Sequence, residues 1–294
     1  MKAGRGLTIQ RMVKLAGISR ASFYRSDSEP AIQSKDQMDL RDAIQKIALE
    51  WPAYGRPRIT AELRRQGWKV NPKRVQRMMR EDNLLCVRKR KFVVTTDSTH
   101  GRKVYPNLAP GLTLTGVNQL WRADITYIRL EEEFVYLAVI LDAYSRRVIG
   151  WALDRTMEDD LTLAALHMAL EQRKPGPGLV HHSDRGSQYA SKDYTDLLKD
   201  RGIDISMSRK GNPWDNASCE SFMKTLKYEE VLRQDYRDLA EAKRSIARFL
   251  DQVYNEMRLH SALGYCPPAE FESSLPKLNP PLPEKNEGPL NAFA

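Results

Sequence analysis

The sequence predicts an α/β domain with a mixed five-stranded sheet, preceded by an all-helical region. From Gln119 onward, short runs of residues alternate between apolar and polar side chains, which is typical of strands, and later runs have the spacing of helices. Residues 8–91 instead repeat apolar side chains at helical spacing. The surplus positive charge also lies in this first part, so the two regions differ in composition as well as in pattern.

The charge distribution separates a basic first third from a nearly neutral body. The 294 residues carry a net charge of +9. Residues 1–110 contain 24 Lys and Arg against 10 Asp and Glu, a net of +14, and the remaining 184 residues contain 23 against 28, a net of −5. Such asymmetry indicates a module that binds a polyanion in a salt-dependent manner. The alternative is a basic surface that serves solubility alone.

Composition excludes several classes of protein. No run approaches the ~20 apolar residues that a membrane span needs, and residues 1–6 lead into no apolar signal-peptide region. We therefore expect a soluble protein that stays where it is made. The three cysteines, Cys86, Cys219 and Cys266, are odd in number and far apart, which predicts reduced packing residues instead of a disulfide framework or a zinc ribbon.

Residues 1–30 contain a segment that resembles a helix-turn-helix. The apolar side chains of residues 9–16 share one helical face, Gly17 breaks the pattern, and Ser19 is a candidate N-cap. A second helix over residues 20–25 would present basic and hydroxyl side chains to a DNA groove. Short helical hairpins also occur in proteins that do not bind DNA, so base contact by this helix stays open.

Residues 31–91 predict a second helical module of the helix-turn-helix type. One helix ends at Pro52, the next ends at Gly67, and a third opens at Asn71-Pro72 with an N-cap and an N1 proline. The outer face of the third helix is basic, and a basic run at residues 88–91 follows, either as a solvated linker or as a contact to a DNA backbone. The DNA-binding candidates here are Lys73, Arg74, Arg77, Arg88, Lys89 and Arg90.

Residues 114–235 predict the α/β core, after an extended connector over residues 92–113. Three strands, at 121–128, 134–141 and 147–153, form an antiparallel meander. A helix, a strand, a helix, a strand and a helix follow, at 158–173, 179–182, 191–201, about 203–207 and around Glu220. This order is that of ribonuclease H-like folds, in which the first strand, the end of the fourth strand and a later helix converge.

Residues 236–294 predict a helical end of the catalytic region and a tail. A long helix over 238–257 carries apolar residues on one side, within a C-terminal helical part over 236–275. Residues 276–294 contain five prolines and are expected to form a disordered tail.

Three acidic residues occupy the positions at which this fold converges. Asp124 lies on the polar face of the first strand, which predicts that it is not packed into the core. Asp184 lies at a strand-to-helix junction, where α/β folds place ligands, and Glu220 lies near the start of a helix. Carboxylates without Cys or His at zinc spacing favour an all-oxygen site for two Mg²⁺ (or Mn²⁺) ions that support in-line phosphoryl transfer.

Two histidines next to this site are weaker ligand candidates. His181 and His182 are adjacent in the fourth strand, so their side chains point to opposite faces. This arrangement predicts one structural histidine and one at the rim.

The spacing of the carboxylates and their flanking residues carry a resemblance to a known family. Asp124 and Asp184 are separated by 59 residues (184 − 124 − 1), and Asp184 and Glu220 by 35 (220 − 184 − 1). The matching stretches are Asp124-Ile125-Thr126-Tyr127-Ile128, residues 182–189, residues 208–217, Glu220-Ser221-Phe222 with Leu226-Lys227, and Tyr254-Asn255 with Arg258 and residues 260–264. The chain resembles the D-D-(35)-E core of retroviral integrases and, more closely, the second-reading-frame transposase of the insertion-sequence-three family, over roughly residues 51–272.

The resemblance implies a bacterial DNA transposase that cleaves insertion-sequence ends to a 3′-hydroxyl and joins it to a DNA phosphate. Asp124 and Asp184 would bind the metals, and Glu220 would complete the second metal site. The implied partners are the terminal inverted repeats, target DNA and further copies of the chain, with fusion to a first-reading-frame protein also open. The implied location is the cytoplasm, on the nucleoid when bound to DNA. The family often has Arg where Pro57 stands, which loosens only that local match.

Two rival functions remain on the sequence alone. One is a nuclease of the same fold that hydrolyses DNA or RNA without joining strands. The other is a non-catalytic DNA-binding regulator. The basic module disfavours the first, and the intact carboxylate triad disfavours the second.

The helix that carries Glu220 also predicts DNA contacts. At 100° per residue, Asn216, Lys224 and Lys227 fall within about 40° of Glu220, beside an apolar stripe directed to the core. The alternative is a solvated face on which Lys224 pairs with Glu220. Further along the chain, Arg258 or His260 is placed near DNA or packs the end of the domain. The DNA-binding candidates in this half are Lys210, Asn216, Lys224, Lys227 and Arg258.

Overall fold

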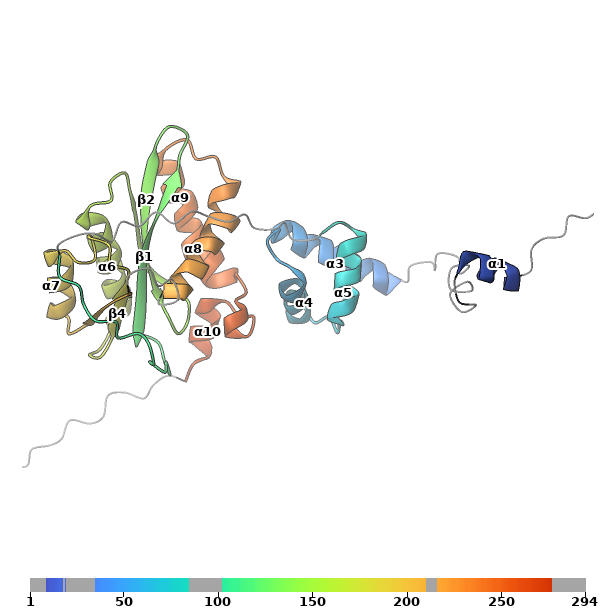
Figure 1. Ribbon diagram of the computed structural model, residues 1–294, viewed down its shortest axis with the longest axis horizontal. Helices are drawn as coiled ribbons and strands as arrows, with labels where there is room; N and C mark the ends of the chain where they lie inside the picture. The colour runs from blue at the N-terminus through green and yellow to red at the C-terminus, as the bar shows by residue number, and fades with distance from the viewer. Residues whose placement is uncertain (1–8, 18, 20–34, 85–101, 210–215, 277–294) are drawn as a thin grey trace, which may run out of the picture. The chain divides into compact units, whose positions relative to one another are not determined.

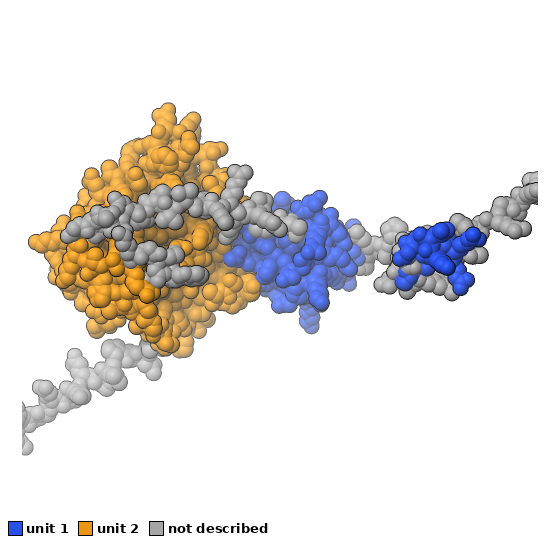
Figure 2. Space-filling model, in the orientation of Figure 1, with its two compact units in different colours: residues 1–86 blue, residues 87–294 orange. Residues whose placement is uncertain are grey.

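A computed structural model describes residues 9–17, 19, 35–84, 102–209 and 216–276 of the chain. The chain divides into two compact units, residues 1–86 and residues 87–294 (Figure 2). Several expectations lie outside the described residues: the helix over 20–25, the basic residues Arg88, Lys89, Arg90 and Lys210, and the tail after residue 276.

The first unit is helical, as predicted. Helix α1 (Ile9–Ala16) ends at Gly17, whose positive φ of 63° suits a residue without a Cβ. Helices α3 (Lys35–Glu50), α4 (Arg56–Arg65) and α5 (Pro72–Glu81) bury one another's apolar faces. Their core contains Ile44, Ile59, Leu63, Val75 and Met78.

Helix α5 begins and is anchored as its sequence predicts. The Asn71 side chain accepts a hydrogen bond from the Lys73 backbone N–H at 2.8 Å, and Pro72 opens the helix. At the other end, the Arg41 guanidinium of α3 binds Glu81 at 2.6 Å and also pairs with Asp82. These contacts fix α5 against α3 and leave its basic face outward.

The second unit is built on one mixed sheet. Strands β1 (Leu120–Arg129), β2 (Phe134–Asp142) and β3 (Val148–Asp154) form an antiparallel meander. Strands β4 (Val180–Ser183) and β5 (Asp204–Met207) continue it in parallel, in the order β3-β2-β1-β4-β5. The predicted mixed five-stranded sheet is confirmed.

Helices cover both faces of this sheet (Figure 1). On one face, α6 (Asp159–Arg173) and α7 (Lys192–Asp200) pack on a core that includes Trp121 and Ala123 of β1. On the other, α8 (Ala217–Glu229) and the C-terminal helices pack on a core that includes Ile128 of β1. Asp124 itself is half-buried and lies outside both cores, but its face of β1 is covered by α8, which the alternation did not predict. Alternation in β1 reports two faces of different polarity, but it does not show whether a later helix covers the polar one.

The C-terminal helices differ from the single long helix that was predicted. Helix α9 (Leu239–Arg248) passes directly into the π-helix η3 (Phe249–Met257), and short helices η2 (Val231–Arg233), η4 (Ser261–Leu263) and α10 (Pro268–Ser274) flank them. Apolar spacing does not distinguish i→i+4 from i→i+5 hydrogen bonding, so the change could not be predicted from the residue pattern. The π-helical half carries Asn255, whose amide bonds both the N–H and the carbonyl of Val148 at 2.9 Å.

Two further expectations concern the described part of the chain. Within it, no helix is both long enough and apolar enough to span a membrane. Cys219 is buried and Cys266 is half-buried, and both are free thiols.

Candidate active site

Strand pairing brings Asp124 and Asp184 to the same level of two neighbouring strands. The parallel register of β1 and β4 aligns Arg122 with His182, and each aspartate follows two residues later. The ladder ends there because β4 stops at Ser183. Asp184 therefore emerges from the carboxyl end of its strand beside the middle of β1, which is where parallel strands of open sheets place ligands.

Helix packing brings Glu220 to this pair. The Cys219 thiol donates to the Arg122 carbonyl at 3.4 Å, and the Asn216 amide donates to the Ala123 carbonyl at 3.3 Å. Both contacts hold the start of α8 against the backbone of β1 immediately before Asp124. Glu220 lies in the first turn of that helix.

The turn after Asp184 depends on glycine. The Gly186 N–H donates to the Asp184 carboxylate at 2.9 Å. A Cβ on Gly186 would lie only 3.0 Å from Asp184 Oδ1 and 3.2 Å from Gln188 Oε1. The absent side chain therefore lets the backbone approach the carboxylate and orient it.

The three carboxylates repel one another. Burial raises the pKa of Asp124 to about 8, the charge of Asp184 adds to the rise and that of Glu220 contributes less, while the Ile125 N–H and the Lys227 ammonium oppose it. The Ile125 N–H donates to the Asp124 carboxylate at 2.9 Å. At Asp124, the nearby ammonium and N–H donor therefore do not offset burial and the neighbouring carboxylates.

This donor set fits a hard divalent cation. Its ligands are carboxylate oxygens without thiol or imidazole, which suits Mg²⁺ or Mn²⁺ better than zinc. The set is convergent but not closed: among the described residues, no three acidic, histidine or cysteine side chains lie at coordinating distance of one point. Glu220 instead pairs with Lys224 at 3.3 Å and is 39% exposed.

Both histidines of β4 are structural. His181 and His182 are 1% and 0% exposed. The Tyr194 hydroxyl binds His181 Nε2 at 3.0 Å, and the two ring nitrogens of His182 bind the hydroxyls of Ser206 and Ser208 at 2.8 and 2.9 Å. The prediction of one rim histidine is wrong because both faces of β4 are covered. Burial also lowers the pKa of His181 to about 3, so it is neutral.

The basic candidates occupy different environments. Lys73, Arg74 and Arg77 are exposed on α5, with Arg77 close to Glu81 at 3.7 Å. On α8, Lys224 is exposed, and Lys227 is half-buried with its ammonium 4.4 Å above the centroid of the Tyr127 ring. Burial lowers the pKa of Lys227, and the charge of Asp124 opposes that change.

Two other candidates lie inside the domain. Arg258 is 3% exposed and makes two hydrogen bonds of 2.7 Å to Glu229 at the end of α8. Asn216 is buried, with its amide on β1. His260 is also buried and packs edge-on against Tyr254 at 4.7 Å. The alternative of packing at the domain end therefore describes Arg258 and His260, and neither Arg258 nor Asn216 is placed for a DNA contact.

Two tyrosines of the matching stretches were not singled out in the sequence analysis. Tyr127 belongs to the stretch that starts at Asp124, and in the strand alternation it falls on the apolar side with Trp121 and Ala123. Its ring is instead partly exposed, beneath Lys227 and edge-on to Phe134 at 5.8 Å. Tyr189 ends the stretch that contains Asp184 and lies buried next to it. Membership in those stretches was the only signal for either residue.

Known proteins resemble the chain over most of its length. The integrase core domain family matches residues 115–213 and 201–268, and an HTH-like domain family matches residues 35–92. Transposase InsF for insertion sequence IS3A of Escherichia coli is 39% identical over 271 residues, covering 90% of this chain and 94% of its own. The insertion element IS600 31 kDa protein of Shigella sonnei is 39% identical over 264 residues, covering 88% and 97%.

The chain belongs to the insertion-sequence-three family of transposases. Its second unit is the integrase core, with the ribonuclease H-like fold, and the helical region before it is HTH-like, as predicted. Among solved structures, the HTLV-2 integrase catalytic core in complex with magnesium covers 54% of this chain and 98% of its own, with 15% identity and a TM-score of 0.40.

Membership settles the class of reaction. The transposase is a polynucleotidyl transferase that acts on DNA, and integrase cores of this type depend on divalent metal ions and work as oligomers. Membership thus disfavours the nuclease and regulator rivals.

Proposed function

We propose that Asp124, Asp184 and Glu220 are the catalytic residues of this transposase and hold two Mg²⁺ (or Mn²⁺) ions. The observation that carries the proposal is the register of β1 and β4, which sets Asp124 beside Asp184 while two contacts press the start of α8 onto β1. The raised pKa of Asp124 supports it, since like charges held together in a partly buried site are stabilised by a bound cation.

The bound ions would supply electrostatic stabilisation of the attacking and leaving oxygens of a phosphoryl transfer. The chain's own contribution is positioning. Two strands of one sheet hold Asp124 and Asp184, the Gly186 N–H orients the second carboxylate, and α8 brings Glu220. Preorganised groups of this kind cost little reorganisation during the reaction.

The chemistry consists of two displacements at phosphorus. First, water attacks the phosphate at the element's end, a P–O bond forms, and the 3′-oxygen leaves as a hydroxyl. That hydroxyl then attacks a target phosphodiester, and the target's 3′-oxygen leaves in the same way. Neither step needs a covalent intermediate on the protein.

The DNA partners would be the element's terminal inverted repeats and the target. Lys73, Arg74 and Arg77 would contact the ends from the helical region, together with Arg88, Lys89, Arg90 and Lys210 outside the described residues. Lys224 and Lys227 would contact the backbone near the carboxylates. We further propose that the protein acts as a homo-oligomer in the bacterial cytoplasm, on the nucleoid, with fusion to a first-reading-frame protein as a possible active form.

The decisive test incubates the purified chain with labelled element ends, target DNA and Mg²⁺ or Mn²⁺. Joined products that carry the label on target DNA are expected, and they should disappear with a chelator. Cleavage without joining would indicate a hydrolytic nuclease, and end binding without either product would indicate an inactive regulator. Either result overturns the proposal.

A further inference from the structure

A buried tyrosine beside the Asp184 turn has an unpaired hydroxyl within the described part of the chain. Tyr189 is 2% exposed, and its enclosed hydroxyl oxygen has no hydrogen-bond partner among the described residues. Buried hydroxyl groups are almost always hydrogen-bonded, and an unsatisfied one costs about 1–3 kcal/mol. The packing of the ring alone does not account for this cost, because phenylalanine would fill the same space without it.

The Tyr189 ring lies against the Asp184 turn. Its backbone N–H donates to the Gly186 carbonyl at 3.1 Å. A Cβ built on Gly186 would meet Asp184 Oδ1 at 3.0 Å and Tyr189 Cδ2 at 3.7 Å. The carboxylate and the edge of the tyrosine ring therefore both lie close to the same glycine of the turn.

Electrostatics also connects the hydroxyl with the carboxylates. Burial raises the pKa of Tyr189, and Tyr194 and the charges of Asp124 and Asp184 raise it further. The hydroxyl therefore stays protonated near neutral pH. It can act as a hydrogen-bond donor and cannot act as a base.

A neighbouring tyrosine provides the contrast. The Tyr194 ring packs edge-on against Tyr189 at 5.5 Å and is equally buried. Its hydroxyl, however, binds His181 Nε2 at 3.0 Å. Tyr194 is therefore satisfied within the core, whereas Tyr189, whose ring lies at the Asp184 turn, retains an unused donor.

We propose that Tyr189 is a positioning residue for the metal site, and that its hydroxyl donates to an Asp124 or Asp184 oxygen, directly or through one water, when those carboxylates close on the metal. The inference rests on the proposed function for the identity of the ligands. Carboxylates that bind metals are themselves held by hydrogen bonds from a second layer of residues, and loss of such a partner typically weakens metal binding 10–100-fold.

The test compares Tyr189→Phe with Tyr194→Phe in the full chain. Mn²⁺ affinity is measured by calorimetry, and thermal stability is measured in a chelator. Tyr189→Phe is expected to melt at the same temperature as the wild type or higher, because it removes an unpaired hydroxyl, and to bind Mn²⁺ about 10–100-fold more weakly. Tyr194→Phe is expected to melt lower and to bind Mn²⁺ as the wild type does.

A Tyr189→Phe variant with wild-type Mn²⁺ affinity would overturn the inference. So would an equal loss of affinity in both variants, which would indicate general damage to the core. Failure of the proposed ligands is distinguishable, because Asp184→Asn would then bind Mn²⁺ like the wild type. If only the Tyr189 inference fails, Asp184→Asn still loses the metal.

Discussion

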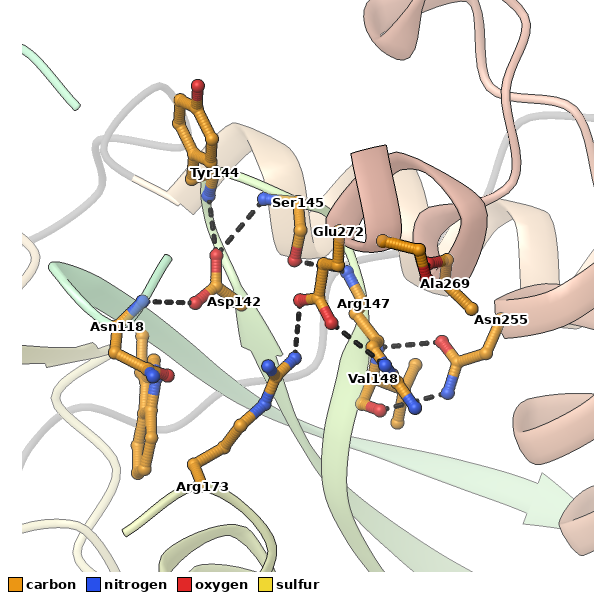
Figure 3. A network of polar contacts seen from close by, with 12 residues as sticks. Asn118, Asp142, Tyr144, Ser145, Arg147, Val148, Arg173, Asn255, Ala269 and Glu272 are labelled. Atoms are coloured by element: carbon orange, nitrogen blue, oxygen red, sulfur yellow. Dashed lines mark hydrogen bonds and ion pairs between the residues drawn. The ribbon is translucent and has the colours of Figure 1, made fainter. Parts of the chain in front are cut away.

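Two sets of acidic side chains lie around the same sheet, and they differ in how many hydrogen-bond donors and positive charges surround them. At the β2–β3 turn, Asp142 accepts hydrogen bonds from the N–H groups of Asn118, Tyr144 and Ser145 at 2.7, 2.9 and 3.0 Å (Figure 3). Burial raises the pKa of Asp142, and these donors offset part of the rise. Its carboxylate closes the turn.

The carboxylate of Glu272 on α10 is paired with positive charge. It binds Arg147 at 2.8 Å and Arg173 at 2.5 Å, and Figure 3 shows it between these two guanidinium groups. Burial would raise the pKa of Glu272, but the hydrogen bonds from Arg173, Ser145 and Arg147 outweigh it and the pKa is lowered. The C-terminal helix is thereby fixed to β3 and α6.

The proposed catalytic set shows the reverse at Asp124. Asp124 has a single backbone donor among the described residues, its own neighbour Ile125, and its pKa is raised to about 8. The same scaffold that surrounds Glu272 with arginines places two further carboxylates near Asp124. The contrast distinguishes acids that stabilise the fold from the acids that we propose to bind a cation.

The largest expected effect is on chemistry. Asp124→Asn, Asp184→Asn and Glu220→Gln each remove a charge at nearly constant shape, so each should reduce strand transfer by roughly a thousandfold or more while the protein remains folded. Joining assays and circular dichroism measure the two properties. Near-normal joining by any variant would remove that residue from the site.

The second-largest expected effect is on folding stability, through the ion pairs of Glu272. Glu272→Gln leaves two arginines near the interior without their carboxylate, so unfolding should become easier by about 3 kcal/mol. Chemical denaturation measures this change. Glu133→Gln is the matched control, because its pair with Arg155 at 3.0 Å is exposed and should contribute no more than about 1 kcal/mol. Equal losses would mean that Glu272 is not a structural anchor.

A smaller effect concerns pH. The Asp124 pKa rises from an ordinary 3.8 to about 8 on folding, so the unfolded chain releases this proton first. Stability in a chelator should therefore fall as pH increases from about 4 to 8. Asp124→Asn should lack this pH-dependent destabilisation and melt at a higher temperature than the wild type near pH 8. If removing the charge stabilises the fold by about 1 kcal/mol, the melting temperature should rise by roughly 2–4 °C.

Thermal melts of both proteins at pH 5 and pH 8 check the direction of this pH dependence. The two proteins should differ more at pH 8 than at pH 5. A wild-type advantage that grows toward pH 8 would show that the Asp124 charge is stabilised by the fold, contrary to the account.

Much of this organisation could be predicted from the sequence, and the misses have physical causes. Strand alternation, helix caps such as Asn71, and the order of elements are local features, so the fold and the three converging carboxylates were predictable. Coverage of the Asp124 face, the burial of His182 and the Arg258–Glu229 pair arise from helices far along the chain. Such tertiary contacts leave no periodicity at the residues they bury.

The smallest expected effect is on DNA affinity. Lys224→Ala and Lys227→Ala should each lower the slope of binding against salt concentration by roughly one unit, because each removes one phosphate contact. Lys199→Ala is the control. This lysine pairs with Asp196 at 2.9 Å and is 51% exposed, close to the 55% of Lys224, but it lies on α7 across the sheet. Identical slopes for all three variants would mean that the α8 lysines only face water.

The central claim is that Asp124, Asp184 and Glu220 bind divalent metal. Its most direct test is the electron paramagnetic resonance signal of free Mn²⁺ during titration of the full chain, for the wild type and the Asp124→Asn/Asp184→Asn double variant. The account predicts saturable Mn²⁺ uptake by the wild type and its loss in the double variant, while Glu272→Gln, assayed below its melting temperature, retains it. Equal uptake by the wild type and the double variant would contradict the claim.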